Sequence, residues 1–555
     1  MRRPRSRPRL AAAGIVALLA ATAAAAQPDH VDEWRTAVSP HFRIHSEAAP
    51  ERTAEIVATL EAFRAVFAGL AAEIELTSSA PTRIYAFRDA DGYSTYKTAA
   101  DRRGVLVLGQ FLSHRDGNFI TLNADPRYLG AFAVVLHEYV HYLVQQNFPR
   151  APRWFNEGLA EYYSTFAVEG GRAVIGRPVE RHQRWLARNA ELGLAEVLAA
   201  PRRDRDDEAL EEGRFYAVSW ALVHYLLSRG DETAPALAAF LARGADGPTA
   251  VALFEESFGL RLDEMEKRLR RYLLGSEVPV AVVSLESLGG VPRVEAAPAD
   301  AAELLTGLGD LLSRMERETE AERHYDLALE YRPGYADALA GLGHLRDRQG
   351  RLEEADALFR EAIAAGGGGA LTHLLYGRHL VGLVETGAPV AGREGRSAVV
   401  REARDVFELA TRLDPGFAEP EAMLGAVHLL GGGLEPADGV APLERATARL
   451  PGRVDLLFYL LQAYLRADRR EEAEALAGGA IATFGDEREA AAREEIERWT
   501  LIRSADRALA AGEVESGLDL LGEAISVTTD PGLRARLVER FEEIRAGAAG
   551  RGPTR

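Results

Sequence analysis

The chain contains no cysteine among its 555 residues. Disulfide bonds, thiolate catalysis and cysteine-ligated metals are therefore excluded, and any transition-metal site must use His, Asp or Glu. Basic residues are in the minority, because 66 Lys and Arg stand against 84 Asp and Glu, and the formal net charge is −18. A chain this acidic is a poor partner for nucleic acid or for an anionic membrane surface.

Long apolar runs are also lacking, apart from one near the N-terminus. Arginines from Arg2 to Arg9 form a basic front, no acid occurs before Gln27, and the apolar run Leu10–Ala26 ends in three alanines. This order predicts a secretory signal peptide over residues 1–26 and export to the bacterial periplasm or the medium. An uncleaved N-terminal anchor is the alternative. No later stretch is apolar enough to span a bilayer, so we expect no integral span after signal removal.

The length of the chain is too great for one hydrophobic core, and its patterns change along the sequence. Strand-like runs occur at 42–45, 83–87, 105–108 and 118–122, with helical spacing over 50–72. From 128 to 273 the pattern is nearly all helical. These patterns predict an α+β domain over residues 27–275.

The second half of the chain is repetitive. Residues 276–300 lose the helical period and are rich in Pro and Gly, so we predict a linker there. From residue 301 a pattern of small and aromatic residues recurs after 34 positions: Leu308-Gly309, Ala321, Tyr325 and Ala328, then Leu342-Gly343, Ala355, Phe359 and Ala362. This pattern resembles the tetratricopeptide repeat and predicts an all-α solenoid over 301–545 with a disordered tail over 546–555. A protein partner or substrate is the expected ligand of such repeats.

A possible metal site begins at His137-Glu138-Tyr139-Val140-His141, inside an uninterrupted apolar run. Positions i and i+4 lie on one face of a helix, so both imidazoles can reach one ion at zinc-ligand distance. Glu138 lies about 100° around the helix, where it can take a proton from a metal-bound water. The alternative is a helix with two solvated or core-satisfied histidines.

A second helix is predicted over residues 154–163, after prolines that end the first one. It presents Glu157 and, one turn later, Glu161 on an apolar face, where unpaired acids are costly. A zinc ion held by His137 and His141 would satisfy Glu157, and Glu161 could accept the free N–H of a ligand histidine. An amphipathic helix with solvated acids is the alternative.

The sequence H-E-x-x-H followed by W-F-N-E-G-x-A-E resembles the gluzincin zinc peptidases, most strongly over residues 131–165. The resemblance implies a zincin-like catalytic domain with Zn²⁺, with Glu157 as third ligand and Glu161 as a carboxylate behind a ligand histidine. Only 15 residues separate His141 from Glu157. The chain therefore looks more like the compact peptidase-MA-like, DUF1570-type proteins, which also tend to carry tetratricopeptide tails. The metzincin pattern fails, because its Gly and His would fall at Val144 and Asn147.

The same resemblance suggests an oxyanion-stabilising residue on a later helix. Gluzincins often use a Tyr or His there, and Tyr216 fits that role, with His224 second. Packing in a helical core is the alternative for both.

Together these features predict an exported zinc metallopeptidase with Glu138 as general base. We expect a protein or peptide substrate, which could pair with an edge strand at 118–122. Two alternatives stay open. One is a catalytically inactive tetratricopeptide adaptor or assembly protein with a vestigial or structural metal site, and the other is a metal-free helical scaffold.

Overall fold

The computed structural model describes residues 31–70, 81–97, 109–125, 127, 130–148, 150–189, 191–200, 209–243, 249–273, 278–290, 292–366, 368–388 and 395–549. The chain forms two compact units, of which the first is Met1–His379 with Leu413–Phe417 and the second is Leu380–Arg412 with Ala418–Arg555. The predicted signal peptide and the predicted strand at 105–108 lie outside the described residues. None of the helices within the described ranges is both long and apolar enough to cross a membrane.

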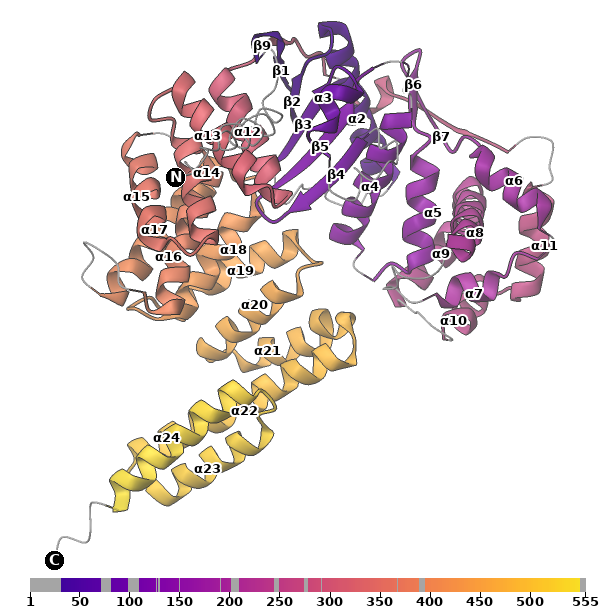
Figure 1. Ribbon diagram of the computed structural model, residues 1–555. Helices are drawn as coiled ribbons and strands as arrows, with labels where there is room; N and C mark the ends of the chain where they lie inside the picture. The colour runs from indigo at the N-terminus through magenta and orange to yellow at the C-terminus, as the bar shows by residue number, and fades with distance from the viewer. Residues whose placement is uncertain are drawn as a thin grey trace, which may run out of the picture. The chain divides into compact units, whose positions relative to one another are not determined.

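The first unit contains a six-stranded mixed sheet with the order β4-β5-β3-β2-β1-β9 (Figure 1). Strands β2, β3 and β5 run parallel, whereas β1, β4 and β9 are antiparallel to their neighbours. The strand bounds are β1 Arg35–Val38, β2 Phe42–Ser46, β3 Thr82–Phe87, β4 Gly109–His114, β5 Gly117–Asn123 and β9 Ala297–Pro298. Helix α2, Pro50–Leu70, connects β2 to β3, and the short α3, Ala90–Ser94, follows β3. The strands predicted at 42–45, 83–87 and 118–122 and the helix between the first two are confirmed.

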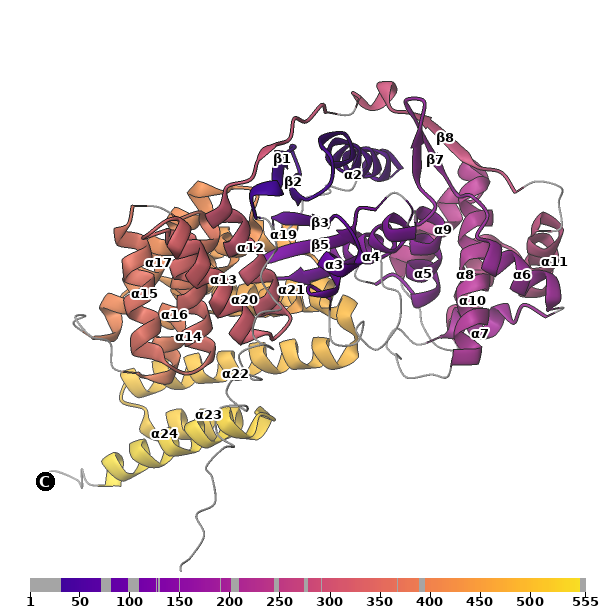
Figure 2. The same cartoon turned by 45° about the horizontal axis from the view of Figure 1, so that its top comes forward.

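The two faces of this sheet are covered by different helices. Because side chains alternate along a strand, Ile84 and Ala86 point to one face and Tyr85 and Phe87 to the other. Ile84 and Ala86 belong to the core that includes α2, α4 (Gly130–Asn147) and α5 (Arg153–Tyr163). Tyr85 and Phe87 pack with leucines of α12, Ala301–Arg314. Figure 2 shows the sheet between these two helical layers.

The region from 128 to 273 is less helical than the sequence indicates. Its described helices after α5 are α6 Glu180–Arg188, α7 Leu194–Ala199, α8 Ala209–Ser228, α9 Ala234–Arg243, α10 Thr249–Phe258 and α11 Leu262–Leu273. The prediction was wrong at β6, Ala167–Glu169, and β7, Arg172–Ile175, which form a hairpin. Gly170 and Gly171 connect the two strands with φ of 55° and 75°, as a tight two-residue hairpin turn requires.

The segment predicted as a linker, 276–300, contributes to both sheets of the first unit. Strand β8, Ala281–Ser284, pairs with β7 to complete a three-stranded sheet. Strand β9 pairs with β1 at the end of the larger sheet. These strands hold the end of the segment against the sheet and bring α12 onto its face.

The repeats consist of paired helices with close contacts at small residues. A Cβ added at Gly309 would lie 2.8 Å from the Tyr325 ring, and one at Gly343 would lie 3.3 Å from Phe359. The repeated glycine and aromatic are therefore partners across each helix pair. The helices after α12 are α13 Glu318–Tyr331, α14 Ala336–Arg348, α15 Leu352–Ala364, α16 Ala370–Thr386, α17 Arg396–Leu413, α18 Ala418–Val427, α19 Val440–Arg449, α20 Val454–Arg466, α21 Arg470–Leu476, α22 Asp486–Ala510, α23 Val514–Val527 and α24 Pro531–Ala549. Helix α24 thus continues into the predicted tail, whose remaining residues lie outside the described ranges.

Candidate metal centre

Helix α4 presents two different faces. Val135, Leu136 and Val140 are buried in the core, whereas Val134 is 40% exposed and Glu138 is exposed. His137 and His141 are half-buried at the border between these faces. The apolar face fixes how the helix lies against the sheet, so both imidazoles project from the same side, as the i, i+4 spacing predicts.

Helix α5 begins directly after Pro152, whose extended backbone turns the chain between the two helices. Trp154 is fully buried and anchors the first turn. Gly158 allows very close packing against α8, because a Cβ there would lie 2.3 Å from the carbonyl oxygen of Ser219. The glycine next to Glu157 therefore lets α5 pack directly against the backbone of α8.

The three predicted ligands converge. The Nε2 atoms of His137 and His141 are 3.1 Å apart. The Oε2 atom of Glu157 lies 3.6 Å from Nε2 of His137 and 3.3 Å from Nε2 of His141. Of the residues that the structure describes, these three are the only group of His, Asp and Glu arranged so that they could hold a metal ion.

The donor set fits a zinc ion. Glu157 Oε2 is buried and has no hydrogen bond of good geometry, although two imidazole nitrogens lie 3.6 and 3.3 Å from it. Two imidazole nitrogens and one carboxylate oxygen are the ligands of several catalytic zinc sites, where a fourth position stays open for water or substrate. A divalent cation would satisfy the carboxylate and remove the contact between the two ring nitrogens.

The electrostatics of the three groups are mutually dependent. Burial raises the pKa of Glu157, but the neighbouring His137 and His141 outweigh burial and hold this pKa at about 2. Burial lowers the pKa of His141, but Glu157 and Asn156 outweigh it and raise this pKa above its usual value. The carboxylate is thus ionised, and a proton on His141 competes with a cation for the same nitrogen.

A second layer of contacts orients the two imidazoles. The Nδ1 atom of His141 lies 3.0 Å from Oδ1 of Asn156, an acceptor that places the proton on Nδ1 and leaves Nε2 free for a metal. Nδ1 of His137 lies 3.8 Å from Oε1 of Glu161, which is longer than a hydrogen bond, and the role of Glu161 as acceptor for this histidine stays a prediction. Asn156 was not predicted, although its position directly before Glu157 was a usable indication.

Glu161 has further partners that sequence reasoning missed. Arg181 donates a hydrogen bond to Oε1 of Glu161, and Nε2 of His182 lies 3.1 Å from Oε2. Both residues come from α6, about twenty positions later in the chain, so no local spacing could reveal them.

The remaining predicted residues differ in their surroundings. Glu138 is exposed on the same helix as both histidines, and its role as base stays a prediction. Tyr216 is half-buried on α8 with its ring 6.0 Å from that of Phe215, and its oxyanion role also stays a prediction. His224 is a core residue, because its ring nitrogens contact the Tyr272 hydroxyl at 2.8 Å and the Gly176 carbonyl at 2.7 Å.

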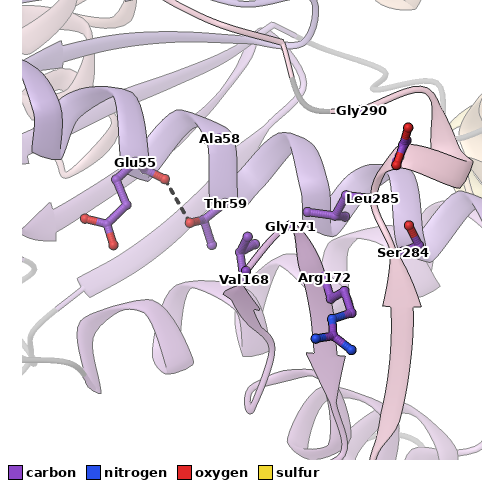
Figure 3. Close-up of a pocket in the computed structure, with 11 residues that line it drawn as sticks. Glu55, Ala58, Thr59, Val168, Gly171, Arg172, Ser284, Leu285 and Gly290 are labelled. Atoms are coloured by element: carbon purple, nitrogen blue, oxygen red, sulfur yellow. Dashed lines mark hydrogen bonds between the residues drawn. The ribbon is translucent and has the colours of Figure 1, made fainter.

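A separate pocket of about 590 Å³ lies elsewhere on the first unit. Figure 3 shows the residues that line it, among them Glu55 and Thr59 of α2 and Val168, Arg172 and Ser284 from β6, β7 and β8. None of the three metal-site residues lines this pocket.

Family profiles match one stretch in each part of the chain. A family profile described as "Protein of unknown function (DUF1570)" matches residues 131–246, which include both histidines and Glu157. The chain carries a DUF1570 domain. A tetratricopeptide repeat profile matches residues 336–365, which confirms the predicted repeats. The DUF1570 region therefore lies in the mixed α/β part, and a mostly helical repeat region follows it.

Two curated relatives of this DUF1570-containing chain are named cellulose synthase operon protein C. The one from Xanthomonas axonopodis pv. citri (strain 306) is 32% identical over 244 residues, which cover 44% of this chain and 15% of the relative. The one from Pseudomonas fluorescens (strain SBW25) is 32% identical over 137 residues, which cover 25% of this chain and 10% of the relative. The chain thus matches only a small part of each relative's length.

Among solved structures, YrrB, described as a TPR protein with an unusual peptide-binding site, is 21% identical to this chain. The match covers 35% of this chain and 92% of YrrB, with a TM-score of 0.28.

Proposed function

We propose that the protein is an exported zinc-dependent peptidase. One observation carries the proposal: two imidazole nitrogens and the unsatisfied Oε2 of Glu157 meet within ligand-forming distance, beside an exposed Glu138 on the same helix. The zincin-like fold, the zinc ion and the peptidase activity all belong to this proposal. Export rests on the basic and apolar order of residues 1–26.

In this mechanism His137, His141 and Glu157 would hold the cation. Bound zinc would supply a Lewis acid that polarises the scissile carbonyl and lowers the pKa of water toward about 7. Glu138 takes a proton from the attacking water and passes it to the leaving amine. The hydroxyl of Tyr216 donates a hydrogen bond to the oxyanion.

The predicted substrate strand requires a correction. Residues 118–122 were expected to form an edge strand, but β5 lies between β4 and β3 in the sheet. Strand order is set by tertiary pairing, which the alternating pattern of a strand does not encode. Among the described strands, β4 is at this edge and contacts α4, so we propose that an extended peptide pairs with β4.

The proposal is tested by zinc analysis together with a peptide-library digest by the purified protein. We expect chelator-sensitive cleavage by the wild type. Glu138→Gln keeps the three ligands but removes the base, so it should retain zinc and lose at least about 100-fold in kcat. Undiminished cleavage by this variant would contradict the assigned base.

The second candidate is a non-catalytic adaptor that binds proteins through its repeats. It is supported by the tetratricopeptide profile match and by the names of the curated relatives. In this case the metal centre would be structural or vestigial. Zinc binding without hydrolysis of any library peptide, together with capture of a protein partner by the repeats, would favour the adaptor over the peptidase.

A further inference from the structure

Helix α6 provides an unexpected support for Glu161, the carboxylate behind His137. Glu161 is 2% exposed and carries two partners from consecutive residues of α6. Arg181 reaches one carboxylate oxygen, and His182 lies 3.1 Å from the other. The oxygen contacted by Arg181 is also the one that faces Nδ1 of His137 at 3.8 Å.

The position of α6 is itself fixed. The His182 side chain is buried, and its ring centroid lies 5.8 Å from that of Trp220, which is fully buried on α8. The chain enters α6 after Gly176, whose left-handed φ of 76° brings its backbone against the Tyr162 ring. A side chain at Gly176 would clash there, so the connection from β7 to α6 has little freedom.

The consequence for Glu161 is geometric. A buried carboxylate with a hydrogen bond from Arg181 at one oxygen and the His182 ring nitrogen 3.1 Å from the other has little freedom to rotate, and both neighbours reduce the cost of burying its charge. The oxygen that faces His137 is then presented in one place. A metal-ligating histidine needs an acceptor near Nδ1 that fixes its tautomer and ring orientation. The direction in which Nε2 of His137 points therefore depends on the position of the Glu161 carboxylate.

We propose that Arg181 and His182 are positioning residues of the metal centre, which hold Glu161 so that His137 directs Nε2 toward a bound divalent cation. This inference rests on the proposed function and concerns metal affinity rather than the chemical step. It also explains why two partners from a different helix converge on one buried acid.

Zinc affinity of the full chain, measured by competition with a chromogenic chelator, tests the inference. Arg181→Met and His182→Leu should each weaken zinc binding by about 10–100-fold, as loss of such outer partners does. Arg184→Met is the matched control, because Arg184 is exposed on the same helix and pairs with the exposed Glu180 at 3.7 Å. The control should bind zinc as the wild type does.

Conservative variants separate positioning from folding. Arg181→Lys and His182→Gln keep a donor for Glu161, and we expect both to recover most of the lost affinity. The tautomer of His137, observed by ¹⁵N NMR of the metal-free protein, should be mostly Nδ1–H in the wild type and mixed in Arg181→Met. A general loss of stability would not produce this selective change at one ring.

The outcomes distinguish the two proposals. Equal zinc affinity in wild type, Arg181→Met and His182→Leu would overturn the inference while leaving the peptidase proposal intact. Reduced affinity in both variants, in a wild type that binds zinc but cleaves no peptide, would support the inference and contradict the peptidase proposal. A wild type that binds no zinc would overturn both.

Discussion

Both faces of the six-stranded sheet bury carboxylates, but the partners of these carboxylates differ between the two faces. On the face covered by α4 and α5, Glu157 Oε2 is buried without a good hydrogen bond and faces two imidazoles. On the face covered by α12, Asp310 accepts from Arg83 at 2.5 Å and from the Tyr325 hydroxyl at 2.9 Å. Asp116, next to β4, is likewise paired with Arg314 and approached by Arg378 at 3.7 Å.

This difference distinguishes the candidate metal centre from the packing interface between the sheet and α12. Buried carboxylates with cationic partners in the protein need no ligand, and they hold the first repeat on the sheet. A buried carboxylate that converges with two imidazole nitrogens instead forms a ligand set that a divalent cation would complete. The first repeat, α12 and α13, therefore acts as a structural layer of the first unit, while the opposite face carries the candidate metal centre.

The largest expected effect comes from removing the structural layer. A chain that ends at residue 300 exposes Trp34, Tyr85, Phe87 and Phe119, which pack against α12 and its neighbours. We expect such a chain to aggregate and to lose cooperative thermal unfolding, because a large apolar face is left uncovered. A chain that ends at residue 366, after α15, is the control and should unfold cooperatively. Soluble, cooperative unfolding of the shorter chain would contradict this account of the interface.

A single substitution in the interface should act on stability and leave the metal centre unchanged. Arg83→Met leaves Asp310 as a buried charge without its Arg83 partner. We expect a loss of about 3 kcal/mol in the free energy of unfolding, measured in urea. Zinc affinity should stay the same. Combining Arg83→Met with Asp310→Leu should restore part of the stability. A single variant that loses zinc affinity in its folded state would show that the two faces are coupled.

For Glu157→Gln we expect the reverse, which is weaker zinc binding with little change in stability. Loss of a ligand should weaken zinc binding by more than the roughly 10–100-fold expected for an outer partner such as Arg181. The free energy of unfolding of the metal-free protein should change by only about 1 kcal/mol, because Gln keeps the size of the side chain and the change removes contacts only to two partly exposed imidazoles. Calorimetric zinc titration and urea unfolding measure the two quantities. A large loss of metal-free stability would instead assign Glu157 to the structural core.

The smallest expected effect is the pH dependence of the metal-free protein. The pKa of His141 is raised above 6.5 in the folded protein. The stabilisation of the fold by protonated His141 is therefore fully present below pH 6.5 and is lost as pH rises through the raised value. The pKa of Glu157 is lowered from 4.5 to about 2 in the folded protein. The stabilisation of the fold by ionised Glu157 is therefore fully present above pH 4.5 and is lost as pH falls toward 2.

The difference in stability between wild type and Glu157→Gln should therefore be greatest between pH 4.5 and 6.5, at about 1 kcal/mol or less. Urea unfolding across pH 4 to 8 measures this difference. A difference that is constant over the whole range would show that the carboxylate and the imidazole do not interact in solution.

Local features of the site could be predicted from the sequence, whereas long-range ones could not. His137, His141 and Glu157 were predictable because helical spacing and the intervening prolines are short-range information. Arg181 and His182 depend on how α6 folds back onto α5, and no sequence spacing encodes that contact.

The same distinction applies to the fold. Strands β2, β3 and β5 could be located from their alternating or apolar residues. The order of the strands in the sheet could not be predicted from these patterns, and β5 was wrongly expected at an edge. The β6–β7 hairpin was missed although Gly170-Gly171 is a turn sequence, because the strands beside it are very short. Strand β9 pairs only Ala297 and Pro298, too few residues for any periodicity.

The metal content of the purified full chain tests the central claim most directly. After dialysis against trace zinc, the account predicts about one zinc ion per wild-type chain and almost none in His141→Ala, with both proteins folded. A wild type without zinc, or a His141→Ala variant that retains the same zinc content, would contradict it.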